Sequence, residues 1–119
     1  MNSKSEQRVR DICLQLPEAS EVTTWGDPTF RVRTRIFAMI KRGDGRISLW
    51  CKAAPGIQRA LIGSAPDRFF RPPYVGHNGW IGVRLDVAVD WDEVADQIAD
   101  SYCLTAPKSL VAQMGSGDR

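Results

Sequence analysis

The stretch that decides the fold is FFRPPYVGHNGWIGVR, at residues 69–84. Two short apolar runs flank a segment rich in proline and glycine, a pattern that predicts a strand, a rigid loop and a second strand. Pro72 and Pro73 have no amide donors, so the first strand should end there or lie at a sheet edge. Gly76 and Gly79 should provide the positive φ angles that the loop requires.

Length and composition indicate one globular domain. A chain of 119 residues can bury one hydrophobic core but is too short for two. No apolar run approaches the roughly 20 residues of a membrane span. The polar segment 1–10 lacks the apolar core of a signal peptide, so we expect a cytoplasmic protein without membrane contact. Residues 1–114 should form the domain and residues 115–119 a disordered tail.

The cysteine and histidine content predicts neither a disulfide framework nor a metal site. The three cysteines, Cys13, Cys51 and Cys103, are odd in number and widely spaced, and the chain has a single histidine. We expect all three to be small buried residues. No cofactor and no metal ion is predicted.

Apolar residues at helical spacing predict an amphipathic helix near each end of the chain. The two buried stripes are Val9, Ile12, Cys13 and Leu16, and Trp91, Val94, Ala95, Ile98 and Tyr102. Ser3 with Glu6, and Asp90 with Glu93, have the spacing of capping boxes. Pro17 should stop the first helix.

Between these helices the chain has the pattern of hairpins. Residues 30–32 and 36–41 are predicted strands joined through Arg33-Thr34. Residues 47–52 form a further strand after a turn at Gly43-Asp44-Gly45. Alternation within this strand places Trp50 on the face opposite to its apolar residues.

The remaining segments complete the order α-β-β-β-α-β-β-α. Residues 18–26 form a connector that ends in at most a short strand, and residues 26–28 form a turn. A short helix should begin at Pro55, and residues 108–114 should add one last turn. The simplest solution is an α+β two-layer sandwich, an antiparallel sheet with its helices on one face. The other face would then be partly open.

Single residues that could suggest catalysis have simpler explanations. His77 lies in a glycine-rich loop with no carboxylate at an evident spacing, so we expect it at the surface rather than in acid–base chemistry. Trp25, Trp80 and Trp91 are expected to anchor the core. The chain is therefore predicted not to be an enzyme.

The net charge of +2 conceals an uneven distribution. Residues 1–30 carry three basic and five acidic side chains, residues 31–84 carry eleven and two, and residues 85–119 carry two and seven. A strongly basic middle segment suggests an anionic partner. The alternative is that the acidic ends fold against the basic middle and neutralise it.

Basic residues on and near the predicted hairpins are the candidates for contacting phosphates, because a guanidinium fork matches phosphate oxygens. The candidate nucleic-acid-binding residues are Arg31, Arg33, Arg35, Lys41, Arg42, Arg46, Trp50, Arg71 and Tyr74. Trp50, or Tyr74 in the loop, would add a stacking surface. Because of the two-residue turn between them, Arg31 and Arg35 need not share a face. Solubilising arginines at a sheet edge would give the same pattern.

Seven segments resemble the MmcQ/YjbR family in their order and spacing. They are Leu16-Pro17-Glu18, residues 25–32 (WGDPTFRV), Ile36-Phe37-Ala38, residues 72–76 (PPYVG), residues 79–83 (GWIGV), Asp90-Trp91-Asp92-Glu93, and Ser101-Tyr102 with Ala106-Pro107-Lys108. The resemblance covers roughly residues 7–110 and implies a two-layer α/β sandwich of the secretion-chaperone type. It also implies the family's usual label, a DNA-binding protein with a double-wing arrangement.

This chain departs from the family pattern at two points. Arg33-Thr34 stands where the first hairpin turn is commonly glycine-rich, and His77 stands where a basic residue is more usual. The leading hypothesis is a non-enzymatic domain that binds DNA or another polyanion. A protein-interaction module is the alternative, and a small enzyme the third. Some relatives carry a formyltransferase label, but His77 with Asn78 does not supply that chemistry.

Overall fold

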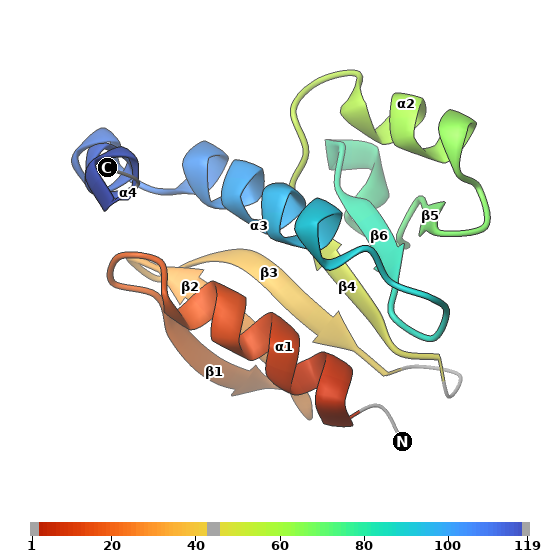
Figure 1. The fold of residues 1–119 in the computed structure, drawn as a ribbon, viewed down its shortest axis with the longest axis horizontal. Helices are drawn as coiled ribbons and strands as arrows, with labels where there is room; N and C mark the ends of the chain where they lie inside the picture. Colours follow the sequence, from red (N-terminus) through yellow and green to blue (C-terminus); the bar gives the residue numbers. More distant parts are fainter. Residues whose placement is uncertain (1–2, 43–45, 118–119) are drawn as a thin grey trace.

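A six-stranded antiparallel sheet forms the centre of the structure (Figure 1). The structure is a computed structural model that describes residues 3–42 and 46–117. Its strands are β1 (Ser20–Thr24), β2 (Asp27–Val32), β3 (Arg35–Lys41), β4 (Ser48–Cys51), β5 (Phe69–Phe70) and β6 (Ile81–Arg84). They lie in the order β1-β2-β3-β4-β6-β5, so β1 and β5 are the edges.

The long helices cover one face of this sheet (Figure 1). The helices are α1 (Ser3–Leu14), α2 (Ile57–Ser64), α3 (Trp91–Thr105) and α4 (Lys108–Gly117), with a 3-10 turn at Gly76–Asn78. Helix α3 packs on β3 and β4 and contacts α1, while α2 packs against β5. The two-layer α+β architecture expected from the sequence is confirmed. Within the described chain no helix has both the length and the apolar character needed to cross a bilayer.

Strand β1 is one strand more than the predicted order contains. Its sequence, SEVTT, has a single apolar residue, so neither period nor hydrophobicity marks it as a strand. The turn after it lies at Trp25 and Gly26, both at positive φ, rather than at residues 26–28. Pro28 therefore belongs to β2, where it is tolerated because pairing with β3 begins only at Thr29.

The capping box predicted at Asp90 and Glu93 forms only in part. Asp90 caps α3, its carboxylate accepting hydrogen bonds from the amides of Asp92 and Glu93. The Glu93 side chain does not return to the cap, because it pairs with Arg68.

At the N-terminus Ser3 is already helical, and Glu6 pairs with Arg42 across to the sheet. Helix α1 ends at Leu14, before Pro17 is reached. Helix α4 continues to Gly117, beyond the boundary at residue 114 that the sequence predicts; residues 118–119 and the turn at 43–45 lie outside the described residues.

The core lies between the sheet and the helices. Its largest fully buried side chains are Tyr102, Phe30, Phe37, Phe69, Ile40, Leu49, Ile81, Ile98, Leu110, Val9, Val32 and Val94. Cys13 and Cys51 belong to it as expected, and burial raises the pKa of the Cys51 thiol to about 12. Cys103 is exposed, contrary to expectation, on the outer side of α3.

The tryptophans occupy three different environments. Trp80 is buried, as predicted. Trp91 is only half-buried against the core, with the Arg8 guanidinium 5.1 Å from its ring centroid. Trp25 is 94% exposed at the β1–β2 turn, so its assignment as a core anchor is wrong. A turn residue at positive φ projects outward from the sheet end, where no core can reach it.

A β-bulge joins the sheet to α3. The β2–β3 register shifts between Phe30 and Arg31, so Phe37 is an extra residue in β3, and its side chain is fully buried. Its ring meets Tyr102 edge to face at 5.3 Å. The Ser101 hydroxyl donates to the Phe37 carbonyl at 2.6 Å and accepts from the Lys52 amide at 2.9 Å. One hydroxyl thus fixes the helix to two strands.

The β2–β3 turn explains why glycine would be favoured there. Arg33 and Thr34 have φ angles of 49° and 69°, the left-handed region in which residues with a Cβ are strained. For a β-branched residue such as Thr34 this conformation is especially unfavourable. The turn holds its shape because β2 and β3 pair directly beside it, Val32 opposite Arg35.

Thr34→Gly should therefore stabilise the protein by about 1 kcal/mol, because relief of the left-handed strain outweighs the added freedom of the unfolded chain. Thermal unfolding should show a melting temperature higher by roughly 4 °C. Thr23→Gly, in the extended strand β1, serves as the matched control and should destabilise by about 0.5–1 kcal/mol. The same sign for both variants would contradict the explanation.

Candidate nucleic-acid interface

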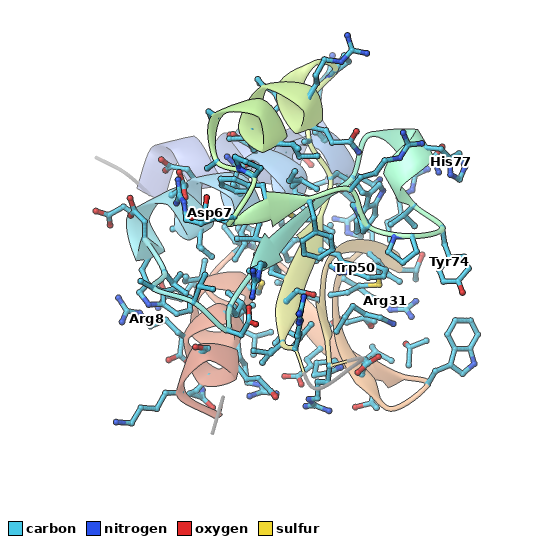
Figure 2. The ribbon with its side chains drawn as sticks, turned by 90° about the vertical axis from the view of Figure 1, so that its right-hand side faces the viewer. Arg8, Arg31, Trp50, Asp67, Tyr74 and His77 are labelled. Atoms are coloured by element: carbon cyan, nitrogen blue, oxygen red, sulfur yellow. The ribbon has the colours of Figure 1, made fainter. Side chains whose placement is uncertain are left out.

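The face of the sheet opposite the helices carries its own set of side chains. Cross-strand partners share a face, and the register aligns Thr29, Met39, Trp50 and Gly82 in one row across four strands. Because side chains alternate along each strand, a second set shares this face: Arg31, Lys41, Ser48 and Arg84. In Figure 2, Arg31, Trp50 and Tyr74 lie on one side of the sheet, and Arg8 lies on the other with helix α1.

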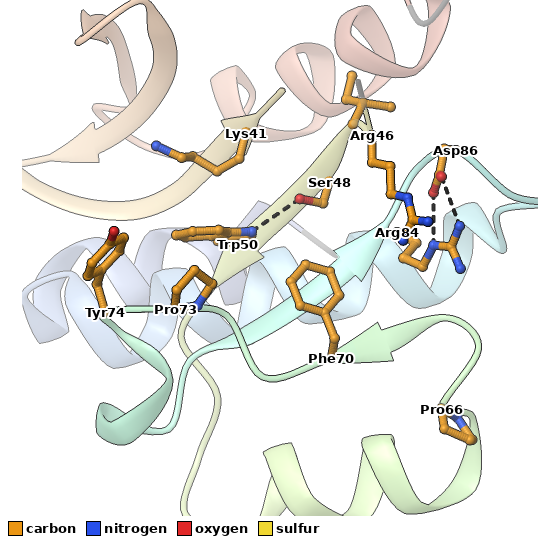
Figure 3. A pocket seen from close by; sticks show the side chains of 11 residues that line it. Lys41, Arg46, Ser48, Trp50, Pro66, Phe70, Pro73, Tyr74, Arg84 and Asp86 are labelled. Carbon is orange, nitrogen blue, oxygen red and sulfur yellow. Dashed lines mark hydrogen bonds and ion pairs between the residues drawn. The ribbon is translucent and has the colours of Figure 1, made fainter. Parts of the chain in front are cut away.

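This open face is hollowed by a cleft of about 650 Å³. Its lining residues are Lys41, Arg46, Ile47, Ser48, Trp50, Pro66, Phe70, Pro73, Tyr74, Arg84 and Asp86. The cleft follows β4, with Pro73 and Tyr74 at one end and the cluster of Arg46, Arg84 and Asp86 at the other (Figure 3). Phe70 lies between the two ends.

Gly82 explains how Phe70 reaches the cleft. The two residues pair across β5 and β6, and a Cβ on Gly82 would overlap the Phe70 ring. The ring therefore lies flat on the backbone of β6, which glycine alone permits. A glycine inside a strand pattern was the available signal for this contact.

Trp50 forms the wall of the cleft rather than an open platform. Its side chain is only 8% exposed, and its indole Nε1 donates to Ser48 Oγ at 3.1 Å. Lys41 Nζ lies 5.3 Å from the ring centroid and 3.1 Å from Asp27 Oδ2. The ammonium therefore covers one ring face of Trp50, although the sequence suggested a free stacking surface there.

Tyr74 is exposed but held by a rigid loop. The residue is 86% exposed, and its φ is 68°. The sequence predicted a positive φ at Gly76 instead, but the φ of Gly76 is not positive. The Val75 amide bonds the Pro73 carbonyl at 2.7 Å, closing a three-residue turn around Tyr74. Gln58 Nε2 reaches in from α2 and donates to the carbonyls of Gly76 and Trp80, at 2.8 and 2.6 Å.

The basic end of the cleft contains two arginines, Arg84 and Arg46. Arg84 donates to both carboxylate oxygens of Asp86, at 3.0 and 2.8 Å. These hydrogen bonds, together with the nearby charge of Arg46, hold the pKa of Asp86 below its usual range. Arg46 itself is exposed and has no ion-pair partner among the residues that the structure describes.

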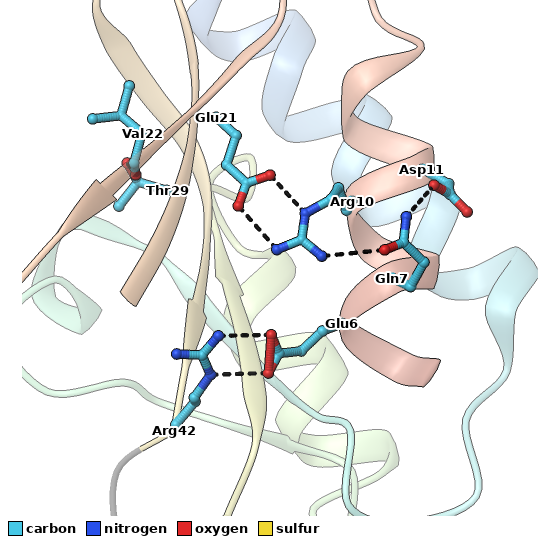
Figure 4. Close-up of polar contacts among 8 residues, drawn as sticks. All are labelled: Glu6, Gln7, Arg10, Asp11, Glu21, Val22, Thr29 and Arg42. Atoms are coloured by element: carbon cyan, nitrogen blue, oxygen red, sulfur yellow. Dashed lines mark hydrogen bonds and ion pairs between the residues drawn. The ribbon is translucent and has the colours of Figure 1, made fainter. Parts of the chain in front are cut away.

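Much of the basic middle segment is neutralised by the acidic ends, as the alternative hypothesis held. The ion pairs that join the two are Arg33–Glu18, Lys41–Asp27, Arg42–Glu6, Arg68–Glu93 and Arg84–Asp86. Figure 4 shows the Glu6–Arg42 pair and the Arg10–Glu21 pair, which attach α1 to the sheet. The hydrogen bond from Arg42 lowers the pKa of Glu6.

The structure separates the predicted binding residues into two groups. Four line the cleft: Lys41, Arg46, Trp50 and Tyr74. Arg31 shares the open face, where it donates to the Thr24 and Thr29 hydroxyls at 3.0 and 3.3 Å. The other four lie apart from the cleft: Arg33 and Arg42 in ion pairs, Arg35 beside the turn on the opposite face, and Arg71 against Gly76.

Sequence reasoning missed three polar residues of the cleft. Ser48 and Arg84 follow from strand alternation once β4 is known to pair with β6. That pairing spans thirty or more residues of chain, and nothing local in the sequence encodes it. Asp86 was counted only as one acid of the C-terminal segment.

Helix α3 and the open face of the sheet carry charges of opposite sign. Helix α3 carries four carboxylates, Asp92, Glu93, Asp96 and Asp100, and no lysine or arginine. The open face carries the four cations Arg31, Lys41, Arg46 and Arg84, and the described carboxylates near them are those of Asp27, Asp86 and Asp67. An anion approaching the molecule is therefore attracted to the open face.

His77 is exposed in the 3-10 turn Gly76–Asn78, as expected. Among residues 3–42 and 46–117 no group of three or more histidine, cysteine, aspartate or glutamate side chains could hold a metal ion.

The fold and this face define an α+β domain with one helix-covered and one open, basic sheet surface. The profile of the YjbR family matches residues 14–104, so the chain belongs to the YjbR family, and the resemblance seen in the sequence is confirmed. The crystal structure of Deinococcus radiodurans protein DR2400, which has a DUF419 domain, is similar in fold. The TM-score is 0.72 at 22% identity, over 81% of this chain and 74% of that one. No curated protein matches the sequence.

Proposed function

We propose that this protein is a non-enzymatic, cytoplasmic domain that binds DNA or another nucleic acid through the open face of its sheet. The observation that carries the proposal is the gathering of Arg31, Lys41, Arg46 and Arg84 on that face, while helix α3 is acidic. Phosphate oxygens are the ligands that guanidinium and ammonium groups recognise without regard to base sequence.

The ion pairs on this face set the strength of binding. Arg46 and Arg31 have no carboxylate partner in an ion pair among the described residues. They can therefore bind a phosphate without first breaking an ion pair. Lys41 and Arg84 must share their donors with Asp27 and Asp86. Each of these pairs is partly exposed, so exchanging the carboxylate for a phosphate costs little. Binding should be weak and dependent on salt.

The placing of the cations supports binding without base specificity. The cations are spread over the face rather than grouped at one point: Arg31 lies in β2, Lys41 in β3, Arg84 in β6, and Arg46 shortly before β4. Such a spread fits a phosphate backbone.

A salt titration against two unrelated duplexes tests the proposal. If the four cations each neutralise one phosphate, the affinity should fall about 150-fold between 50 and 200 mM salt, a slope of about −3.6 in log units. Both duplexes should give the same values, because phosphate contacts carry no sequence information. A flat salt response, or no retention at 50 mM salt, would contradict it.

A protein-interaction module is the second candidate, because the edge strand β1 is unprotected. Its outer side lacks a strand partner among the described residues, Val22 is 43% exposed, and Trp25 follows at the turn. Such an edge can accept a strand from another protein. Thr23→Pro, which removes one edge amide, would then abolish partner binding and leave the affinity for DNA unchanged.

A further inference from the structure

We infer that the cleft beside Tyr74 receives an unstacked base, so that the open face prefers single-stranded nucleic acid over duplex. This inference rests on the proposed function. It adds the form of nucleic acid that the face selects and a residue that contacts the base.

The shape of the face is the first argument. A duplex keeps its base faces stacked inside and presents only phosphates, sugars and groove edges, so it requires cations but no hollow. This face has a cleft of about 650 Å³, within the range of small-ligand sites, and much of its lining is apolar. Phe70, Pro73 and Tyr74 offer surfaces against which a flat base can pack (Figure 3).

The way in which Tyr74 is held is the second argument. Fixing the backbone of an exposed tyrosine usually adds nothing to the stability of the fold. Tyr74 nevertheless has a φ of 68°, in a turn closed by the hydrogen bond from the Val75 amide to the Pro73 carbonyl. Two residues further along the loop, the Gly76 carbonyl accepts a hydrogen bond from Gln58. Strained, over-determined backbone concentrates at binding sites, because a ring fixed beforehand loses little entropy when a ligand stacks on it.

The position of the cations is the third argument. Lys41 lies above Trp50 with its amine toward Tyr74, and Arg46 and Arg84 lie at the end away from Tyr74 (Figure 3). A strand whose base enters beside Pro73 and Tyr74 can therefore place its following phosphates at Lys41 and then at Arg46. A basic groove that follows the backbone, with aromatic rings for the bases, is the arrangement of single-strand binding surfaces.

The experiment compares three ligands with matched backbones. They are a single strand of about 12 nucleotides, an abasic strand of the same length and a duplex of that length. The base-bearing strand should bind the wild-type protein about 5- to 150-fold more tightly than the abasic strand, since stacking of one base supplies that factor. It should also bind more tightly than the duplex at the same salt.

Two exposed aromatic residues at positive φ give a matched pair of variants. Asparagine tolerates this backbone conformation, so Tyr74→Asn and Trp25→Asn both remove a ring without distorting the turn. Tyr74→Asn should bring the affinity for the base-bearing strand down to that for the abasic strand and leave the salt slope unchanged. Tyr74→Phe should keep the preference, and Trp25→Asn, away from the cleft, should bind as the wild type does.

The outcomes distinguish this inference from the proposed function. Equal binding of the base-bearing and abasic strands by the wild-type protein would overturn the base site and leave phosphate binding in place. A loss of the preference in Trp25→Asn but not in Tyr74→Asn would also overturn it. Failure of all three ligands to bind at about 50 mM salt would reject the proposed function itself.

Discussion

Ser101→Ala should lower the free energy of unfolding by about 2–4 kcal/mol, a large effect for the loss of one oxygen atom. The hydroxyl bonds the carbonyl of Phe37 in the β-bulge and the amide of Lys52 after β4. Each backbone group that loses its partner in a buried site costs about 1–3 kcal/mol, and the higher helix propensity of alanine offsets only a few tenths. The melting temperature should fall by roughly 8–16 °C.

Ser64→Ala provides the control for this prediction. The Ser64 hydroxyl also bonds a backbone carbonyl, that of Leu61 at 3.2 Å, but at the exposed end of α2. Water can replace that bond, so the change should stay within about 0.5 kcal/mol. If the two variants were equally stable in chemical denaturation, the attachment of α3 through Ser101 would contribute nothing, and packing of Phe37 and Tyr102 alone would hold the helix.

The elements with strong local patterns could be predicted from the sequence. Alternation along residues 47–52 correctly placed Leu49 and Cys51 in the core and Trp50 on the other face. The cap at Asp90 was correct because it depends only on backbone amides two and three residues away. These features are local, so a single sequence carries enough information to place them.

Backbone conformations at the turns were less predictable, because this chain uses non-glycine residues at positive φ. Trp25, Arg33, Thr34 and Tyr74 all occupy the left-handed region. Propensity assigns that region to glycine or asparagine, so the loop prediction chose Gly76 instead of Tyr74. The surrounding hydrogen bonds and strand pairs over-determine these turns, and such tertiary effects have no local signal.

The candidate site needed the pairing of distant segments. Glu6 meets Arg42 and Glu18 meets Arg33 only after the N-terminal segment has folded against β2 and β3. The total charge of residues 31–84 therefore overstated the free positive charge. The structure places Arg33, Arg35, Arg42 and Arg71 apart from the cleft. The β4–β6 register adds Arg84, so a smaller group of cations remains on one face.

Replacing Arg31 and Arg46 together by glutamine should weaken DNA binding on the order of a hundredfold at 50 mM salt. These are the two open-face cations without a carboxylate partner among the described residues, so their loss leaves no acid unpaired. With two phosphate contacts remaining, the salt slope should fall from about −3.6 to about −1.8, and the loss between 50 and 200 mM salt from about 150-fold to about 12-fold.

The matched control is the double variant Arg35→Gln with Arg59→Gln. It removes the same two charges from exposed positions, one beside the β2–β3 turn and one on α2, neither of which lines the cleft. Net charge is then equal in the two variants, so any difference between their salt slopes reports contact at the open face rather than long-range attraction. An unchanged slope in Arg31→Gln with Arg46→Gln, or an equal reduction in both variants, would show that the phosphates do not contact the open face. The protein-interaction module, with its edge strand β1, would then be the better candidate function.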